Sequence, residues 1–281
     1  MKNIFFLFLG ILFFSCNDFS QENNSGEKII LEEKNDTEKK EGKRLVALLE
    51  EDKIDFSIDY LMGKFDPAKN TDFVSVDKKY SDGDPYFLRK ETYESFKKMW
   101  SAAKADGIDL KIISATRNFA RQKYIWERKW TGARKIESGA DASKKYPVTK
   151  DRALAILKYS SMPGTSRHHW GTDIDINRLT NEYFAEGQGK KEYDWLVANA
   201  ARFGFCQPYT PKGDERPHGY NEEKWHWSYI PVARQLTDKA ATELKDEMIG
   251  GFKGAETALE IGVVEKYVLG INEDCKMKNE E

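Results

Sequence analysis

Short apolar runs that suit β-strands alternate along this chain with runs that suit helices, but the regular strand–helix–strand rhythm of a parallel sheet is missing. The strand-like runs cover residues 109–115 and 225–230. Helical spacing of apolar residues, with caps or glycines at the ends, predicts six helices: 44–51, from Asp84-Pro85 to Gly107, after Asn118, 150–159, 193–203 and from Pro231 onward. We therefore expect an α+β domain in which helices flank a small, mainly antiparallel sheet.

The first residues are typical of an export signal rather than of this domain. Lys2 is followed by an apolar run over 4–14, which is too short to cross a bilayer and has the length of a signal-peptide core. Ser15 and Cys16 end the run, and a small residue before a cysteine resembles the signal of a bacterial lipoprotein, which is cut before a cysteine that then receives lipid. The alternatives are an ordinary signal peptide cut elsewhere and an uncleaved anchor. In each case we expect an exported protein.

The segment after this signal has the composition of a tether. Residues 16–44 are rich in Glu, Lys, Asn and Ser and contain one short apolar triplet, so they cannot bury enough surface to fold alone. We interpret 1–15 as a signal peptide, 16–44 as a disordered tether and 45–281 as the globular domain. Several acyl chains on Cys16 would hold the protein firmly at a membrane, facing the periplasm or cell envelope, without indicating whether the membrane is the inner or the outer one.

Composition excludes several other classes of protein. Hydrophobic residues make up 40% of the 281 residues, which is enough for one well-packed domain. Lys and Arg number 45 against 47 Asp and Glu, and this balance argues against a nucleic-acid partner. Three cysteines are too few for a disulfide framework. Beyond Cys16, residues Cys206 and Cys275 could pair in an oxidising compartment, but the sequence leaves their geometry open.

The four histidines, at 168, 169, 218 and 226, stand close to acidic residues. The segment 166–175 reads SRHHWGTDID, and Glu223 precedes His226 by three residues. Two imidazoles and one carboxylate are a common ligand set for catalytic Zn²⁺, which leaves a fourth position for water. A glutamate that is not a ligand suits the general base of a zinc hydrolase.

These residues resemble the signature of the zinc D-alanyl-D-alanine carboxypeptidases, the LAS group named after lysostaphin, D-Ala-D-Ala metallopeptidases and sonic hedgehog. That signature is SxHxxGxAxD, followed tens of residues later by ExxH, with an arginine upstream and a glutamine five residues after it. The matching residues are Arg117, Gln122, Ser166, His168, Gly171, Asp175, Glu223 and His226. The resemblance spans about 111–231, points to the branch related to vancomycin-resistance D,D-carboxypeptidases, and implies the zinc peptidase fold of that group.

The resemblance also implies a role for each matched side chain. His168, Asp175 and His226 would bind one zinc ion. Glu223 would take a proton from the attacking water and pass it to the leaving amine. Arg117 would stabilise the oxyanion, an interaction worth about 3 to 4 kcal/mol in the transition state. Two further residues would position the substrate, for example through its terminal carboxylate: Gln122 and Ser166.

Asp173 departs from the family pattern, which usually has a small residue at that position. In a strand Asp173 and Asp175 point to the same face, so alternation alone cannot choose the ligand, and the signature spacing favours Asp175. Asp173 would then either orient a ligand histidine or raise the pKa of its neighbour through like-charge repulsion. His169 lies one position out of register, which suggests a structural or supporting role. His218 is expected to be a surface residue or a substrate contact.

These expectations combine into a lipid-anchored, exported zinc peptidase that removes the C-terminal D-Ala of peptidoglycan stem peptides, acting as a monomer. Alternatives within the same chemistry are an L,D-carboxypeptidase and an endopeptidase that cuts inside a stem or cross-bridge. A non-catalytic module that keeps the zinc fold to bind the cell wall is the alternative from another class. The presence of Glu223 beside a full ligand set favours an enzyme.

Overall fold

The computed structural model describes residues 57–276. The predicted signal peptide, the tether, Cys16 and the helix expected over 44–51 lie outside these residues. Within the described part of the chain, no helix combines the length and the apolar character that crossing a bilayer requires.

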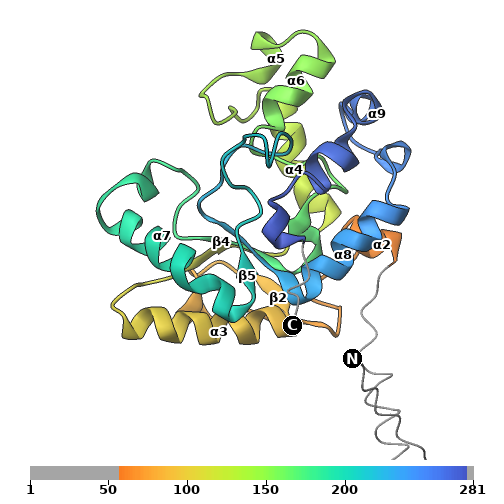
Figure 1. Ribbon diagram of the computed structural model, residues 1–281. Coiled ribbons are helices and arrows are strands. Elements are labelled where there is room, and N and C mark those ends of the chain that lie inside the picture. Colours follow the sequence, from red (N-terminus) through yellow and green to blue (C-terminus); the bar gives the residue numbers. More distant parts are fainter. Residues whose placement is uncertain (1–56, 277–281) are drawn as a thin grey trace, which may run out of the picture. The chain divides into compact units, whose positions relative to one another are not determined.

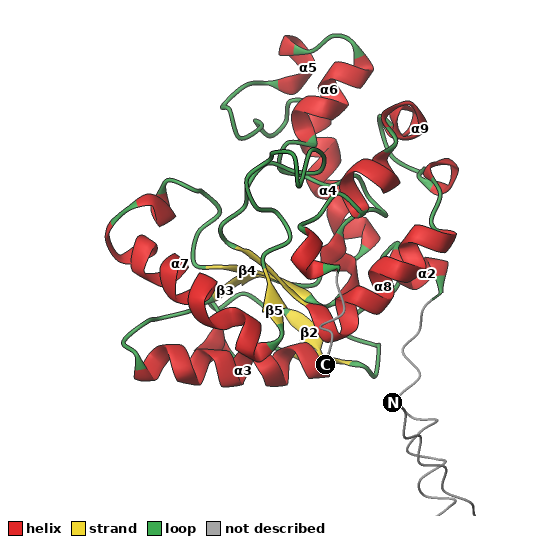
Figure 2. Ribbon diagram, in the orientation of Figure 1, coloured by secondary structure: helices red, strands yellow, loops and turns green. Residues whose placement is uncertain are grey.

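Four short strands form an antiparallel sheet at the centre of the described domain, in the order β3-β4-β6-β5 (Figure 2). The strands are β3 (Ile112–Ser114), β4 (Asp173–Ile176), β5 (Phe205–Cys206) and β6 (His226–Tyr229). The register of β4 against β6 pairs Asp175 with His226 and Asp173 with Ser228. Residues from two motifs that are far apart in the sequence thus become direct neighbours, and the predicted fold class is confirmed.

One face of this sheet is covered by two helices, α3 (Lys90–Ala105) and α7 (Gly187–Asn199), which lie along the lower and left sides of the domain in Figure 1. Ile174, Ile176 and Trp227 point to this face and pack in one apolar cluster with side chains of both helices. Fully burying a side chain of this size stabilises the fold by about 1.5 to 3 kcal/mol. The sheet is therefore anchored from this face, which leaves its other face free for polar side chains.

A two-stranded antiparallel sheet, β1 (Phe73–Ser75) with β2 (Phe87–Arg89), precedes α3. The prediction of a helix that starts at Asp84-Pro85 is wrong at this end, because 87–89 form a strand and the helix begins at Lys90. Leu88 is fully buried in the α3 cluster, and the backbone N–H of Arg89 donates to Gly171 O at 3.1 Å. These contacts with residues far away in the sequence favour a strand over 87–89, although the local capping signals favour a helix.

The remaining helices each contribute buried side chains to a second apolar cluster. They are α2 (Ile58–Leu61), α4 (Phe119–Trp130), α5 (Ala142–Lys145), α6 (Thr149–Ile156), α8 (Ile230–Glu243) and α9 (Ala258–Ile261). Asn118 caps α4 as predicted, since its side chain accepts a hydrogen bond from Arg121 N at 2.9 Å. The short α5 is a helix that the sequence did not predict, and α7 starts six residues before the predicted Tyr193.

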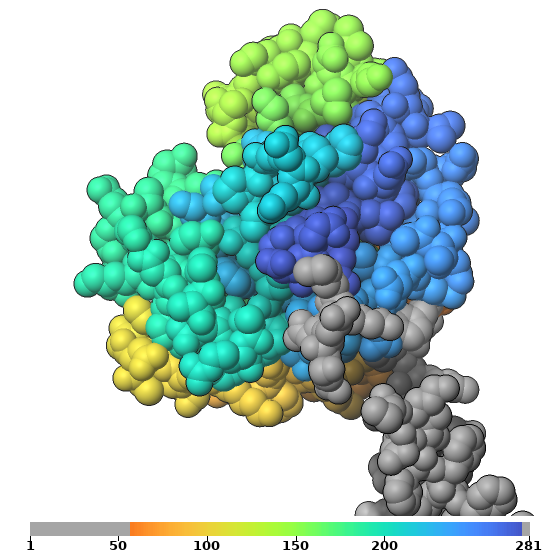
Figure 3. Space-filling view, viewed as in Figure 1, coloured from red at the N-terminus to blue at the C-terminus, as the bar shows by residue number. Residues whose placement is uncertain are grey.

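The chain after α8 returns across the loop 207–220, and the two segments lie side by side in Figure 3. A disulfide joins Cys206 to Cys275, which are 69 residues apart, so the pairing that the sequence left open is present in the structure. The N–H of Asn272 donates to Pro208 O at 2.8 Å. The rings of Tyr220 and Tyr267 lie 5.2 Å apart. The C-terminal segment thus fastens the loop that borders the polar face of the sheet.

Candidate active site

A tight turn links the first histidine motif to the sheet. His168 lies in a short 3-10 helix, Arg167–Trp170, that ends at Gly171 with a φ of 75°. A Cβ at Gly171 would collide with the ring of Phe73, so both the backbone conformation and the space favour glycine. The chain then enters β4 directly. His168 and Asp175 therefore reach the same side of the sheet from the two sides of one turn.

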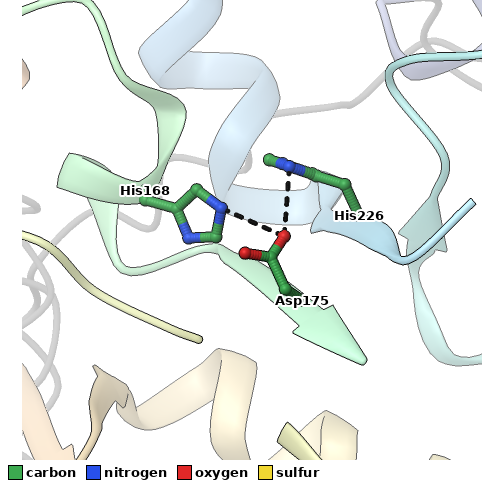
Figure 4. A group of neighbouring side chains, drawn as sticks. All are labelled: His168, Asp175 and His226. Atoms are coloured by element: carbon green, nitrogen blue, oxygen red, sulfur yellow. Dashed lines mark ion pairs between the residues drawn. The ribbon is translucent and has the colours of Figure 1, made fainter. Parts of the chain in front are cut away.

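The three predicted metal ligands converge above β4 and β6 (Figure 4). Nε2 of His168 lies 3.3 Å from Oδ1 of Asp175, and Nδ1 of His226 lies 3.4 Å from the same oxygen. One donor atom from each residue can be chosen so that all three lie within 4.8 Å of one another. Ligand atoms held about 2.0 to 2.1 Å from a tetrahedral zinc ion are about 3.3 Å apart, so this spacing fits zinc.

Two of these donor atoms lack any other partner. Nε2 of His168 and Oδ1 of Asp175 are buried and have no hydrogen-bond partner among the described residues. A buried polar atom without a partner destabilises a fold by about 1 to 3 kcal/mol, and coordination to a metal removes that penalty. The residues present therefore fit a zinc ion held by two imidazoles and one carboxylate.

In the rings of His168 and His226, the nitrogen that points away from the predicted metal position is held by a neighbouring oxygen. Nδ1 of His168 lies 2.9 Å from Ala115 O, and Nε2 of His226 lies 2.9 Å from Oδ2 of Asp173. Each partner is an acceptor, so each of these nitrogens carries the ring proton. The opposite nitrogens, Nε2 of His168 and Nδ1 of His226, face the predicted metal position, where a zinc ion would take the place of any proton on them.

Asp173 belongs to a fully buried network behind His226. Nε of Arg167 lies 3.2 Å from Oδ2 of Asp173, and the hydroxyl of Ser228 donates to Oδ1 at 2.8 Å. Burial opposes the charge on Asp173, but Arg167 and His226 together hold the pKa of this carboxyl below its ordinary value. Of the two roles that the sequence left open, this geometry matches the one in which Asp173 orients a ligand histidine.

Glu223 sits beside the predicted metal position without being one of the three converging donors. Oε2 of Glu223 lies 3.1 Å from Nδ1 of His226, and the residue is buried at the end of the loop that leads into β6. Its backbone N–H donates to Tyr209 O at 2.9 Å, which fixes the loop. Burial raises the pKa of the Glu223 carboxyl and so makes its ionised form a stronger base.

Arg117 approaches the site from the end of β3. Its Nη1 lies 3.6 Å from Oδ2 of Asp175 and donates to Ser114 Oγ at 2.6 Å, and its Nε donates to Gln122 Oε1 at 3.0 Å. Gln122 is buried, and its own amide donates to Ser161 O at 2.8 Å. The Gln122 side chain therefore holds the guanidinium of Arg117 in place, a contact that the sequence did not predict beside its expected role toward the substrate.

The other predicted residues, Ser166, His169 and His218, differ in how close they lie to the predicted metal ligands. Ser166 lines the catalytic pocket, and its buried hydroxyl has no hydrogen-bond partner among residues 57–276. His169 is fully buried: Gly164 N donates to its Nε2 at 3.1 Å, its Nδ1 donates to Arg117 O, and burial lowers its pKa to about 3. His169 is therefore neutral and supports the backbone of Arg117. His218 is exposed and does not line the pocket.

Several residues that line the pocket were missed by the sequence analysis, among them Tyr209, Arg167 and Lys129. The ring of Tyr209 packs edge-on against His226, with centroids 4.8 Å apart. Arg167 is buried behind the site, and Lys129 is buried in the pocket wall with its ammonium bound to Glu137 and Ser160. Lys129 lies seven residues after Gln122 on α4, and this helical spacing was the one signal that could have placed it in the wall. Nothing near Tyr209 or Arg167 marks them in the sequence.

Fold, ligand geometry and the adjacent carboxylate define a mononuclear metal-dependent hydrolase site. The chain belongs to the family described as VanY, D-alanyl-D-alanine carboxypeptidase, whose model matches residues 86–232. This match includes α3 and β2 and so begins upstream of the segment, about 111–231, in which the sequence motifs lie.

Two relatives are similar in sequence to this chain over part of their length. The chain is 30% identical over 155 residues to a D-alanyl-D-alanine carboxypeptidase of Enterococcus faecalis, covering 54% of this chain and 51% of that protein. It is 28% identical over 191 residues to YodJ of Bacillus subtilis, covering 65% of this chain and 61% of that protein. The chain thus spans between half and two thirds of the length of these relatives.

Solved structures are similar at lower identity. VanYB in complex with D-alanine-D-alanine aligns with a TM-score of 0.45 and 24% identity, over 62% of this chain and 92% of that one. The LD-carboxypeptidase LdcB aligns with a TM-score of 0.46 and 24% identity, over 75% and 81% of the two chains.

Proposed function

We propose that this protein is a zinc-dependent D,D-carboxypeptidase that hydrolyses the C-terminal D-Ala of peptidoglycan stem peptides. The observation that carries the proposal is the position of Glu223, whose carboxylate lies 3.1 Å from a donor atom of the His168, Asp175 and His226 set without belonging to that set. A module that kept the metal only for structure would not need a second buried carboxylate beside it. Membership of the VanY family supports the substrate class.

The residues divide the chemistry between them. Bound zinc supplies a Lewis acid that lowers the pKa of water to about 7. Glu223 accepts the proton of the attacking water and then delivers it to the amine of the departing D-Ala. Arg117 stabilises the negative charge that develops on the carbonyl oxygen, and Gln122 and Ser114 hold its guanidinium in position. The free hydroxyl of Ser166 is available to bind the substrate.

The test is a product analysis with defined muropeptides. We expect the purified, zinc-loaded chain to release D-Ala from a pentapeptide stem, with Glu223→Gln as the matched control that keeps the fold and zinc but loses this release. Mass spectrometry of the products separates the alternatives. Cleavage of a tetrapeptide instead would indicate an L,D-carboxypeptidase, and cleavage of cross-linked dimers an endopeptidase. Binding to cell wall without any cleavage would indicate a non-catalytic module.

We also propose that the protein is an exported lipoprotein anchored to a membrane through Cys16 and active as a monomer. The apolar run over 4–14 that ends at Ser15-Cys16 supports the anchor. The three predicted ligands, Glu223 and Arg117 form a complete set within one copy of the chain, so the proposed chemistry does not require a second copy. Cells that express the protein should incorporate labelled palmitate into it, and Cys16→Ala should abolish both the label and membrane fractionation. Equal labelling of the two forms would contradict the anchor, and a dimer in sedimentation would contradict the monomer.

A further inference from the structure

A second cleft adjoins the catalytic pocket. The catalytic pocket has a volume of about 130 Å³, and the second cleft has one of about 590 Å³. Four residues line both cavities: Glu137, Tyr159, Leu179 and Trp225. The smaller cavity has room only for the end of a peptide, whereas the larger one falls within the range of about 300 to 1,000 Å³ that is typical of ligand sites. A longer substrate would therefore extend from the first cavity into the second.

The shared wall is largely aromatic and apolar. The rings of Tyr159 and Trp225 lie 6.3 Å apart with an interplanar angle of 30°, and the side chain of Leu179 is 51% exposed. An exposed leucine beside two rings offers the aliphatic parts of a peptide a surface to pack on. The backbone of a ligand that passes over this wall would lie between the two cavities.

The second cleft also carries two lysines whose ammonium groups have no anionic partner among the described residues, although that of Lys145 lies 5.8 Å from the centroid of the Tyr146 ring. Lys145 ends α5 and Lys158 follows α6, and neither ammonium group forms an ion pair or hydrogen bond with any residue of 57–276. Of the two acids that line the cleft, Glu137 is bound by Lys129, and Glu182 accepts a hydrogen bond from Thr180.

Charge in the second cleft therefore favours an anionic ligand. The ion pair with Lys129 neutralises Glu137, which leaves two lysines against the single charge of Glu182. Arg134 adds to this bias at the edge of the catalytic pocket, because it is exposed and its guanidinium has no ion pair among the described residues. The ligand chemistry that fits is a carboxylate carried on a partly apolar chain.

We propose that this cleft is a second substrate subsite, which binds the part of an acidic peptide that precedes the scissile bond and places a peptide carboxylate near Lys145 and Lys158. The inference rests on the proposed function and deepens it, because it assigns Lys145 and Lys158 to the recognition of the part of a stem peptide that precedes the terminal D-Ala-D-Ala. The free dipeptide D-Ala-D-Ala cannot reach the second cleft and gains nothing from it.

The test compares three substrates with the zinc-loaded full chain: the dipeptide D-Ala-D-Ala, the pentapeptide L-Ala-γ-D-Glu-L-Lys-D-Ala-D-Ala, and the same pentapeptide with the glutamate α-carboxylate amidated. The double variant Lys145→Gln/Lys158→Gln should lower kcat/KM for the acidic pentapeptide by about 2- to 30-fold, the size expected of two exposed charged contacts. The decrease in kcat/KM should come from a higher KM, with kcat unchanged. Rates with the dipeptide and the amidated pentapeptide should not change.

Lys144→Gln is the matched control, because Lys144 is the neighbouring residue on α5, has a side chain that is 84% exposed, and does not line the cleft. It should leave all three substrates unaffected. An equal effect of the double variant on all three substrates, or none on the acidic pentapeptide, would overturn the subsite. If the wild-type chain releases D-Ala from the pentapeptide in that experiment, the proposed function still holds while the subsite fails. Absence of any release would instead overturn the proposed function.

Discussion

The two faces of the central sheet are built from alternate residues of the same two strands and have opposite chemistry. On one face Ile174, Ile176 and Trp227 are buried among the apolar side chains of α3 and α7. On the other, Asp173, Asp175, His226 and Ser228 are equally buried but polar. Apolar side chains can be buried without hydrogen-bond partners, whereas burial of an unpaired polar atom destabilises the fold. Each polar atom on the second face therefore needs a hydrogen-bond donor, an acceptor or a metal ion. The contrast predicts that substitutions on the two faces should damage different properties.

The largest effect is expected on the polar face at Asp175. Asp175→Ala should weaken zinc binding by more than about 100-fold, beyond the range of about 10- to 100-fold seen for residues that only support a ligand. Hydrolysis should fall to background. Zinc content by plasma emission and affinity by competition with a chelator would measure this. If zinc were lost from an Asp173 variant and retained here, the assignment of the ligand would be reversed.

Arg117 tests the same face through a residue that forms an ion pair with Asp175 but is not itself one of the three predicted ligands. Arg117→Ala should lower kcat by about 10²- to 10³-fold, as expected when an oxyanion donor is removed. Zinc content should stay at one ion per chain. Steady-state kinetics on a pentapeptide together with metal analysis would check both statements. A variant that raised only KM would show that Arg117 binds the ground state rather than the transition state.

On the apolar face, Ile174→Ala should reduce the free energy of unfolding by about 2 to 5 kcal/mol, because it opens a cavity under the sheet. Urea unfolding at saturating zinc would measure the loss, and Ile174→Val, with an expected loss of about 0.5 to 1.5 kcal/mol, is the graded control. The folded fraction should still bind zinc. Loss of zinc binding with unchanged stability would contradict the division of roles between the faces.

The smallest effect is expected at Asp173, which supports His226 from behind. Asp173→Asn keeps the shape but removes the charge, so zinc affinity should fall by about 10- to 100-fold. The buried Arg167 would lose the one charged partner that it has among the described residues, and some stability should be lost with it. Zinc affinity and unfolding should be measured together. Unchanged affinity would mean that the charge of Asp173 is not needed to orient His226 toward the metal.

Much of the site could be predicted because its signals are local. His168 and Asp175 stand seven residues apart on one turn and one strand, and Glu223 and His226 three apart, so spacing alone brings each pair near one place. What could not be predicted depends on distant contacts. Strand β2 forms because β1 pairs with it, and α7 extends back to Gly187 although glycine is a weak helix former. The second cleft is likewise assembled from five separate stretches of the chain: 136–138, 145–146, 155–159, 179–182 and 221–225.

The disulfide closes residues 206–275 into a covalent ring. Glu223 and His226 lie inside this ring, whereas His168 and Asp175 lie outside it. A zinc ion held by all three ligands would therefore be a second cross-link, tying the ring to the rest of the sheet. Residues 206–275 would then be held by two cross-links. A reductant would open the disulfide, and a chelator would remove the zinc ion. While the zinc ion is bound, reduction of the disulfide should leave 206–275 resistant to proteolysis. While the disulfide is intact, removal of the zinc ion should do the same.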